Sequence, residues 1–222
     1  MSITLRQSSI KSWLYCRAQY YAQYVLGVPL GLGNLNLEFG TMFHSEVENY
    51  HRGKAYNEDL ISGYIKHYEP VGDPEVSFEF KIDDIRFTGM VDLMLPDETR
   101  DLKTSSTSYS QTKIDHVLGA TTTFGYDGTG LQATAYTYWR YLQEGNIYPF
   151  TFVIYRKDKP LWTPERRIQQ VTTTRTEQDM HIFEQFVRNI ASQIEQETEY
   201  ICSCNDKEHQ VWQPTLTSLT YP

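Results

Sequence analysis

The stretch Phe87-Thr-Gly-Met-Val-Asp-Leu-Met-Leu-Pro-Asp-Glu-Thr-Arg-Asp-Leu-Lys-Thr104 decides the fold of this 222-residue chain. Two apolar runs, 87–95 and 99–104, flank the turn-forming sequence Pro96-Asp97-Glu98. Apolar runs on either side of a short polar turn predict a β-hairpin. We therefore expect the rest of the chain to be organised around this hairpin.

Each strand of the predicted hairpin carries one carboxylate. Because side chains alternate along a strand, Asp101 and Lys103 face one layer and Leu102 faces the other, and Asp92 can lie beside that pair. Acids in strands apolar enough to be buried are costly unless something binds them, and a divalent cation is the first candidate. The alternative is that Asp101 and Lys103 only form an ion pair along an edge strand.

Length and composition indicate one globular domain over residues 1–222. We expect a helical part at 1–70, a catalytic sheet with one further helix at 75–175, and a C-terminal helix and tail at 176–222. The sequence has no apolar run of 18 residues and no recognisable signal peptide, so we expect a cytoplasmic protein with no membrane partner.

The net charge of −8, from 20 basic and 28 acidic residues, argues at first against a nucleic-acid partner. Its distribution changes this interpretation. Residues 1–37 contain three basic residues and no acid, and residues 156–175 contain six basic residues and two acids, whereas residues 38–101 contain fifteen acids and six basic residues. Acids at the centre suit metal binding, and basic residues at the periphery suit a polyanion.

The apolar spacing predicts one helix over residues 9–26, with Ser8 as its N-cap and Gly27 as its stop. The other surface of this helix offers Lys11, Arg17 and Tyr20, a mixture suited to phosphates and unstacked bases. In the alternative interpretation, the tyrosines belong to the core and the basic residues are merely solvated.

Further elements follow from the same patterns. We expect one helix from Thr41, with His44 beside its apolar face, and another over 58–68. A third helix is expected over 131–142, with Gln132 and Tyr136 on a common face, and a fourth begins at a capping box at Thr176. Strands are expected over 75–82, 147–155 and 167–173. Residues 105–129 are rich in Ser, Thr and Gly, and we expect a substrate-facing flap or a mobile loop there.

In this order the motifs resemble those of the RecB-type branch of the PD-(D/E)XK nuclease superfamily, whose relatives include lambda exonuclease and the CRISPR-adaptation nucleases. The matching segments are the Ser8 to Val25 helix, Gly40-x-x-x-His44-x-x-x-Glu48, Gly89 to Asp92, Asp101-x-Lys103-Thr104, and Gln132-x-x-x-Tyr136. Together these five segments span about 130 residues.

The resemblance implies a restriction-endonuclease-like α/β core, in which helices flank a central mixed sheet. It also implies that His44, Asp92, Asp101 and the Leu102 carbonyl bind Mg²⁺ or Mn²⁺; histidine is a soft ligand for Mg²⁺, which leaves room for Mn²⁺. Lys103 would position or deprotonate the attacking water. The residues that would contact DNA are Lys11, Arg17, Tyr20, Thr104, Gln132, Tyr136, Arg166 and Arg167.

Two segments depart from the family pattern. The family's Cys-Pro-Arg-Arg segment is Cys16-Arg17-Ala18-Gln19 here, which puts its DNA-binding role in doubt. Some relatives hold a [4Fe–4S] cluster with four cysteines, but this chain has only Cys16, Cys202 and Cys204, with His209 where a fourth ligand would fall. We therefore expect no iron–sulfur cluster.

The leading hypothesis is a metal-dependent deoxyribonuclease, more specifically an exonuclease that acts on DNA ends or single strands in recombination, repair or phage DNA processing. No helicase motif is present, so we expect a stand-alone module with room for a recombination or helicase partner. The alternatives are a non-catalytic nucleic-acid-binding protein of the same fold and an unrelated α/β protein.

Overall fold

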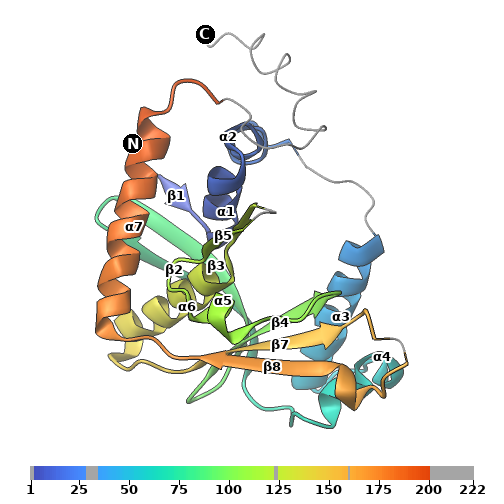
Figure 1. The fold of residues 1–222 in the computed structure, drawn as a ribbon. Helices are drawn as coiled ribbons and strands as arrows, with labels where there is room; N and C mark the ends of the chain where they lie inside the picture. Colours follow the sequence, from blue (N-terminus) through green and yellow to red (C-terminus); the bar gives the residue numbers. More distant parts are fainter. Residues whose placement is uncertain (1–2, 29–34, 123–124, 160, 201–222) are drawn as a thin grey trace.

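The computed structural model describes residues 3–28, 35–122, 125–159 and 161–200 (Figure 1). Its centre is a six-stranded sheet of order β1-β3-β4-β7-β8, with β2 paired to the remaining edge of β3. The strands are β1 Thr4–Leu5, β2 Asp73–Ile82, β3 Ile85–Met94, β4 Thr99–Ser105, β7 Phe150–Arg156 and β8 Ile168–Thr173. The sheet is mixed, because β1 with β3 and β4 with β7 are parallel and the other pairs are antiparallel.

Helices cover both faces of this sheet. The longer ones are α1 Gln7–Tyr15, α3 Leu35–His51, α4 Glu58–Ile65, α6 Thr129–Glu144 and α7 Glu177–Gln196; shorter elements are α2 Arg17–Tyr20, the π-helical η1 Tyr21–Val25, α5 Gln111–Asp115, η2 Glu165–Arg167 and the small β5–β6 pair, Ala120–Thr122 with Gly125–Asp127. The predicted fold class, a central mixed sheet flanked by helices with a helical N-terminal segment, is confirmed.

The period-two alternation of strand side chains builds two cores. On β7, Phe152 and Ile154 pack into the core that α1, α6 and α7 cover, while Val153 packs into the core beneath α3 and α4. Leu102 of β4 also faces the α3–α4 core, as its alternation with Asp101 predicts. The central strands are therefore apolar on both faces, and a charged side chain in them needs a specific partner.

The predicted hairpin is confirmed as β3 and β4, joined by a turn at residues 95–98. Its two strands pair at two positions, Leu93 with Arg100 and Met94 with Thr99, and no further register pair follows. From there β4 pairs with β7 over seven residues, while β3 pairs with β2. We call the divergence of β3 and β4 beyond these pairs the fork.

The helix predicted over residues 9–26 is broken at Cys16. This residue is extended (φ −157°, ψ 115°) and buried, and it separates α1 from α2, which runs on into η1. The predicted stop at Gly27 is confirmed, since Gly27 has a left-handed φ of 68°, whereas the predicted N-cap at Ser8 is wrong, because α1 begins at Gln7 with Arg6 as its N-cap. The break rotates the second half of the segment, so a single helical wheel does not describe which side chains it exposes.

Two other predictions need correction. The helix α3 begins at Leu35 and not at Thr41; Gly40 lies inside it because the helix passes close to β4, and a Cβ there would lie 3.2 Å from Thr104 Oγ1. The described part of residues 105–129, predicted as a substrate-facing flap or a mobile loop, contains regular structure, and Tyr109 and Asp127 within it line a hollow beside Lys103. This segment contains α5, whose Ile114 is buried, and Thr173 of β8 donates a hydrogen bond of 2.8 Å to Asp115.

The remaining predicted elements are found near their expected bounds as α4, α6, α7, β2, β7 and β8. Thr176 and Asp179 form the predicted capping box of α7. Among the helices that the structure describes, none combines the length and apolarity that a membrane span requires.

A buried arginine ties α6 to the hairpin turn. The Arg140 side chain is 2% exposed, and its guanidinium donates hydrogen bonds of 3.0 to 3.1 Å to the carbonyls of Leu95, Pro96 and Glu98. These three carbonyls belong to the turn, where the Glu98 carbonyl also accepts a hydrogen bond of 2.9 Å from the backbone N–H of Leu95. We call this set of contacts the Arg140 clamp, and it fixes α6 against the strands that carry Asp92 and Asp101.

Candidate metal centre

The fork brings together the charged residues of the hairpin. Asp92 Oδ2 accepts a hydrogen bond of 2.6 Å from the backbone N–H of Leu102, in the place that a ladder bond would otherwise fill. On β4, Lys103 Nζ lies 2.6 Å from Asp101 Oδ2, as their common face predicts. Asp101 is 1% exposed, so this ion pair is buried at its acidic end.

The helix α3 delivers His44 to the same place. Its Nδ1 lies 3.6 Å from Asp92 Oδ2, and its ring hydrogen-bonds the backbone carbonyl of Leu102. The close passage of α3 over β4 at Gly40, one turn earlier, makes this reach possible. The structure therefore places His44, Asp92 and the Leu102 carbonyl side by side, as the resemblance implies.

Sequence reasoning missed Glu75. It lies on β2 between the register pairs Pro74 with Leu93 and Val76 with Val91, hence opposite Asp92. Its φ of 56° is left-handed, which is uncommon for a residue other than glycine. His44, Glu75 and Asp92 each offer a ligand atom within 4.8 Å of the others. The sequence offers only one sign of this ligand, an acid next to Pro74, and such a pair of residues is too common to indicate a metal ligand.

The helix α6 completes the surroundings of Asp101. Gln132 Nε2 donates to Asp101 Oδ1 at 2.6 Å and to the Tyr136 hydroxyl at 3.2 Å. The spacing of four residues places both side chains on one helical face, as predicted. Gln132 and Tyr136 are 8% and 7% exposed, so they act on the acid from inside the core.

Burial dominates the electrostatics of these groups. It raises the pKa of Asp92 to about 6 and the pKa of Asp101 to about 7, against the opposing effect of Lys103. Burial also lowers the pKa of His44, which keeps the imidazole neutral near pH 7, the form that binds metals. Burial alone would lower the pKa of Lys103, but the Asp101 and Asp92 carboxylates have the larger effect and raise it. Lys103 therefore stays protonated.

These residues fit a divalent cation. Asp101 Oδ2 is buried, and within the described part of the chain it accepts no hydrogen bond beyond its ion pair with Lys103. The buried Asp101 and the half-buried Asp92 share the fork with the imidazole of His44 and a third acid, Glu75. Such a set is costly without a cation, and its oxygen-rich donors suit Mg²⁺ or Mn²⁺.

Three hollows surround this centre. The site hollow, about 690 Å³, is lined by His44, Glu75, Asp92, Lys103 and Thr104, among others. The helix hollow, about 450 Å³, lies along α1 and α2 and is lined by Lys11, Ser12, Gln19, Tyr24, Lys103, Tyr109 and Gln132, among others. Lys103 lines both, so these two hollows meet at its side chain.

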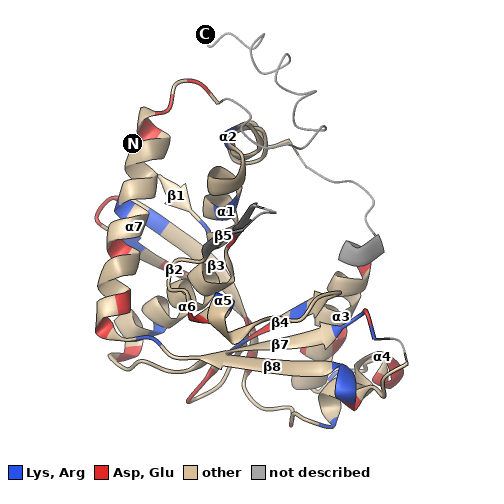
Figure 2. Ribbon diagram, viewed as in Figure 1, with Lys and Arg blue, Asp and Glu red and all other residues tan. Residues whose placement is uncertain are grey.

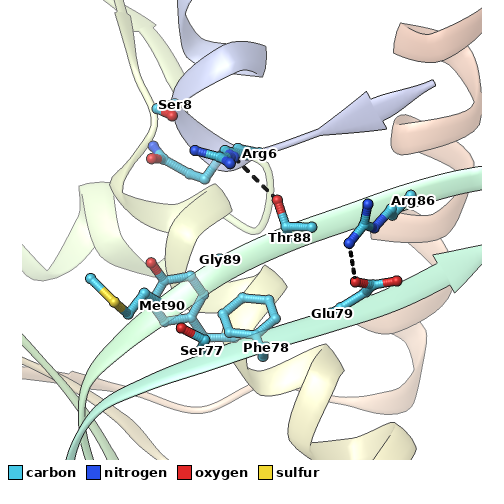
Figure 3. A pocket seen from close by; sticks show the side chains of 11 residues that line it. Arg6, Ser8, Ser77, Phe78, Glu79, Arg86, Thr88, Gly89 and Met90 are labelled. Carbon is cyan, nitrogen blue, oxygen red and sulfur yellow. Dashed lines mark hydrogen bonds and ion pairs between the residues drawn. The ribbon is translucent and has the colours of Figure 1, made fainter.

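The third hollow, about 740 Å³, lies where α1 begins over β2 and β3 (Figure 3). Arg6 Nε donates to Thr88 Oγ1 at 3.2 Å on its rim, while Arg86 pairs with Glu79. Among the described residues no carboxylate forms an ion pair with Arg6, so its positive charge is available at the edge of the candidate site. Tyr136 lines this hollow as well.

The residues predicted to contact DNA do not form one surface. Lys11 lines the helix hollow and Thr104 the site hollow. By contrast, Tyr20 is 5% exposed and packs against Trp13, so the alternative interpretation of the tyrosines as core holds for it. Arg17 pairs with Glu197 and lies 4.9 Å over the ring of Trp13.

Arg166 and Arg167 lie in η2, beside α4, where Figure 2 shows a basic segment next to β8. Arg167 donates to the hydroxyl of Tyr155. Of the candidate cluster ligands, Cys16 is buried, and Cys202, Cys204 and His209 lie outside the described residues. The expectation that there is no iron–sulfur cluster stays a prediction.

Comparisons with known proteins identify the fold. No family model matches the sequence, and no curated protein matches it. The structure is similar to the crystal structure of a "Putative exonuclease" from Eubacterium rectale, with a TM-score of 0.60 and 13% identity, over 95% of this chain and 88% of the other. At this identity the likeness shows a shared nuclease-like fold and assigns no role to any residue of this chain.

Proposed function

We propose that the chain is a metal-dependent deoxyribonuclease of the RecB-like branch, which hydrolyses phosphodiester bonds of DNA. The observation that carries the proposal is the buried Asp101, held by Gln132 on one oxygen and paired with Lys103 on the other, within the fork that also gathers His44 and Asp92. A structural ion pair has no need of an imidazole and two further acids around it. The nuclease-like fold agrees with this proposal.

The metal ligands in this proposal are His44, Glu75 and Asp92, together with Asp101 and the Leu102 carbonyl. A bound Mg²⁺ or Mn²⁺ supplies an acidified water and positive charge at the phosphate. Gln132 donates to one Asp101 oxygen, which leaves the other oxygen, paired with Lys103, as the one that would hold a cation. The Lys103 ammonium, retained by the two carboxylates, hydrogen-bonds the water or the phosphate and offsets charge that develops there.

The proposed substrate is DNA, attacked at ends or in single strands as an exonuclease does, in recombination, repair or phage DNA processing. The basic side chains that line the hollows around the site, Arg6 and Lys11, support a polyanionic ligand despite the net charge of −8. The acids that line the site hollow are proposed metal ligands or their neighbours, so a bound cation would also reduce repulsion between the site and a phosphate.

The test is release of acid-soluble nucleotides from single- and double-stranded DNA with Mg²⁺ or Mn²⁺, against an EDTA control. We expect metal-dependent release by the wild type and none by Asp101→Asn. Labelling either end of the substrate distinguishes exonucleolytic from internal cleavage. DNA binding without release by the wild type, with either metal, would contradict the proposal and favour a non-catalytic nucleic-acid-binding protein.

A further inference from the structure

Two of the described side chains that line the helix hollow each carry a buried polar atom without a hydrogen-bond partner. Ser12 Oγ and Gln19 Oε1 are buried and have no hydrogen-bond partner within the described part of the chain, and both side chains line this hollow. A buried polar group without a partner weakens folding, and native chains satisfy most such groups. Two of them on side chains that line one hollow, next to Lys103, indicate that something absent from the free protein completes them.

We infer that the helix hollow is a subsite for one unpaired nucleobase of the substrate strand, next to the phosphate at Lys103. The inference rests on the proposed function and specifies which part of the substrate occupies this hollow. Gln19 Oε1 can only accept a hydrogen bond, so its partner must bring a donor. Phosphate oxygens and the ether oxygens of an internal deoxyribose are acceptors, whereas every base carries an amino or imino donor on its edge.

The composition of the hollow agrees with this occupant. The Tyr24 ring, stacked on Tyr20 with centroids 5.5 Å apart, and the Tyr109 ring both line it, and aromatic rings are the usual platforms for unstacked bases. The Ser12 hydroxyl can donate or accept, which suits the alternating donors and acceptors of a base edge. The volume of about 450 Å³ lies within the range of about 300–1,000 Å³ typical of small-ligand sites.

Charge in the hollow also suits a strand of nucleic acid. Lys11 contributes a cation, and among the described lining residues the one acid, Asp127, is engaged by Lys113 at 3.3 Å and by the backbone N–H of Thr129. The base that enters must use its edge donors toward the protein. In a duplex every base is stacked between its neighbours and the imino N–H of thymine is already used in pairing, so a base can enter this hollow only after it has left the helix, and the preferred substrate is a single strand or a frayed end.

The experiment compares two labelled oligonucleotides of equal length, oligothymidylate and the same chain with every base removed. The two carry the same phosphate charge, so contacts to phosphates contribute equally to both affinities and do not affect their ratio. Fluorescence anisotropy with Ca²⁺ in place of Mg²⁺ or Mn²⁺ measures binding without requiring cleavage. For the wild type we expect about 10-fold weaker binding of the abasic chain, as loss of a base contact of about 1.4 kcal/mol gives.

The variant Gln19→Met keeps the shape of the side chain and removes the acceptor. We expect it to bind oligothymidylate about 10-fold more weakly, so that the ratio of the dissociation constants of the abasic chain and oligothymidylate falls toward one. The matched control is Gln143→Met on the exposed face of α6, which should keep the wild-type ratio. An unchanged ratio in Gln19→Met, or equal binding of both oligonucleotides by the wild type, would overturn the inference.

Two further readouts separate the possible failures. Gln19→Met and Ser12→Ala each remove an unpartnered buried atom, so we expect their Tm without ligand to equal or exceed that of the wild type. A lower Tm in both would mean that these atoms are structural and would overturn the subsite. Base-dependent binding without any cleavage would retain the subsite and overturn the nuclease, whereas cleavage without base dependence would do the reverse.

Discussion

Lys103 is the residue at which binding and catalysis can be separated. The proposed metal ligands do not include it, so Lys103→Ala should leave cation and DNA bound and lower the single-turnover rate about 10²- to 10⁴-fold. The measurement is rapid-quench cleavage of bound DNA, with metal affinity determined separately by calorimetry. The Asp101 carboxylate that Lys103 leaves behind is buried, so Tm is recorded for each variant.

The control for this prediction is Lys103→Arg. Its guanidinium keeps the charge but is larger, planar and unable to release a proton near neutral pH. If it restores the rate, the ammonium acts only as a point charge. Loss of DNA binding by Lys103→Ala, with an unchanged rate for the DNA that still binds, would instead make Lys103 a phosphate anchor and contradict the mechanism.

Glu75 allows ligand and strain effects to be told apart. Its left-handed φ of 56° costs about 1 kcal/mol for a residue with a Cβ, a cost that glycine does not have. Glu75→Gly relieves this strain but adds the backbone entropy that glycine loses on folding, about 0.5–1 kcal/mol, so the metal-free protein should gain at most a few tenths of a kcal/mol while Mn²⁺ binding weakens. Glu75→Gln keeps the strain and should weaken Mn²⁺ equally without the gain in stability. Urea unfolding and metal titration provide the two measurements, and unchanged Mn²⁺ affinity in both variants would remove Glu75 from the site.

The acids at the fork also predict a pH dependence of stability. Burial raises the pKa of Asp92 to about 6 and of Asp101 to about 7, so the folded chain binds their protons more tightly than the unfolded chain does. Stability of the metal-free protein should therefore fall as the pH rises from about 4 to about 7. His44, whose pKa burial lowers, opposes part of this fall.

Scanning calorimetry between about pH 4.5 and pH 8 measures this fall, and the carboxyl pKa values define that window. The double variant Asp92→Asn with Asp101→Asn should flatten the curve, and saturating Mn²⁺ should do so in the wild type because a cation stabilises the ionised carboxylates. A metal-free double variant with the same slope as the wild type would show that other groups cause it.

For single residues, the sequence predicts the face of a strand on which each side chain lies, because side chains alternate along a strand. The common face of Asp101 and Lys103, and the opposite face of Leu102, follow from the strand period and are confirmed by the 2.6 Å ion pair and the α3–α4 core. Glu75 could not be found in this way, because a left-handed residue interrupts the alternation of β2. The positive φ depends on tertiary packing, which a local pattern does not contain.

Among the elements, α6 and the hairpin act as one unit through the Arg140 clamp. Arg140→Met would remove a donor from three carbonyls of the turn, of which that of Leu95 belongs to a buried residue, and we expect a loss of about 2 kcal/mol in the free energy of unfolding. The cleavage rate per folded molecule should fall as well, because the same helix positions Gln132 against Asp101. Denaturant unfolding and single-turnover rates measure the two effects.

The matched control is Glu144→Gln, which removes the charge from the half-exposed partner of Arg140 and leaves the clamp intact. We expect a change of at most about 1 kcal/mol there and a normal rate. If both variants lose the same stability, the clamp is an ordinary helix ion pair and does not align the site.

Elements with a strong local period were predictable, and those defined by packing were not. The hairpin, α4, α6 and α7 follow from apolar spacing and caps. The break at Cys16 changes the helix axis without changing the apolar spacing around it, so periodicity could not reveal it. Gly40 suggested a helix start, although its role is the close contact with Thr104, which lies on a strand 64 residues later.

For the whole molecule, the net charge of −8 makes the salt dependence of DNA binding informative. Lys11→Ala should reduce the slope of log affinity against log salt by about 0.7 to 0.9, as expected for one lost phosphate contact. Arg17→Ala is the comparison, because Arg17 is already paired with Glu197, and we expect a smaller change. Anisotropy titrations over a range of salt concentrations measure both slopes.

Arg166→Ala extends this measurement to the far side of the α3–α4 layer. A reduced slope in Arg166→Ala, with no change in Lys11→Ala, would place the DNA path along η2 and contradict the route past the helix hollow. Reduced slopes in both would indicate a strand that crosses the site from one side to the other.

The fork has a consequence for attempts to engineer this protein. Two strands that stop pairing beside their own turn leave hydrogen-bonding capacity unused, and Asp92 fills one such place with its carboxylate. Any screen that rewards heat resistance alone will therefore enrich substitutions that extend the ladder from Leu93 toward Val91. Each added backbone hydrogen bond between β3 and β4 would displace the Asp92 carboxylate. The most heat-stable variants from such a screen should therefore be those with the least activity.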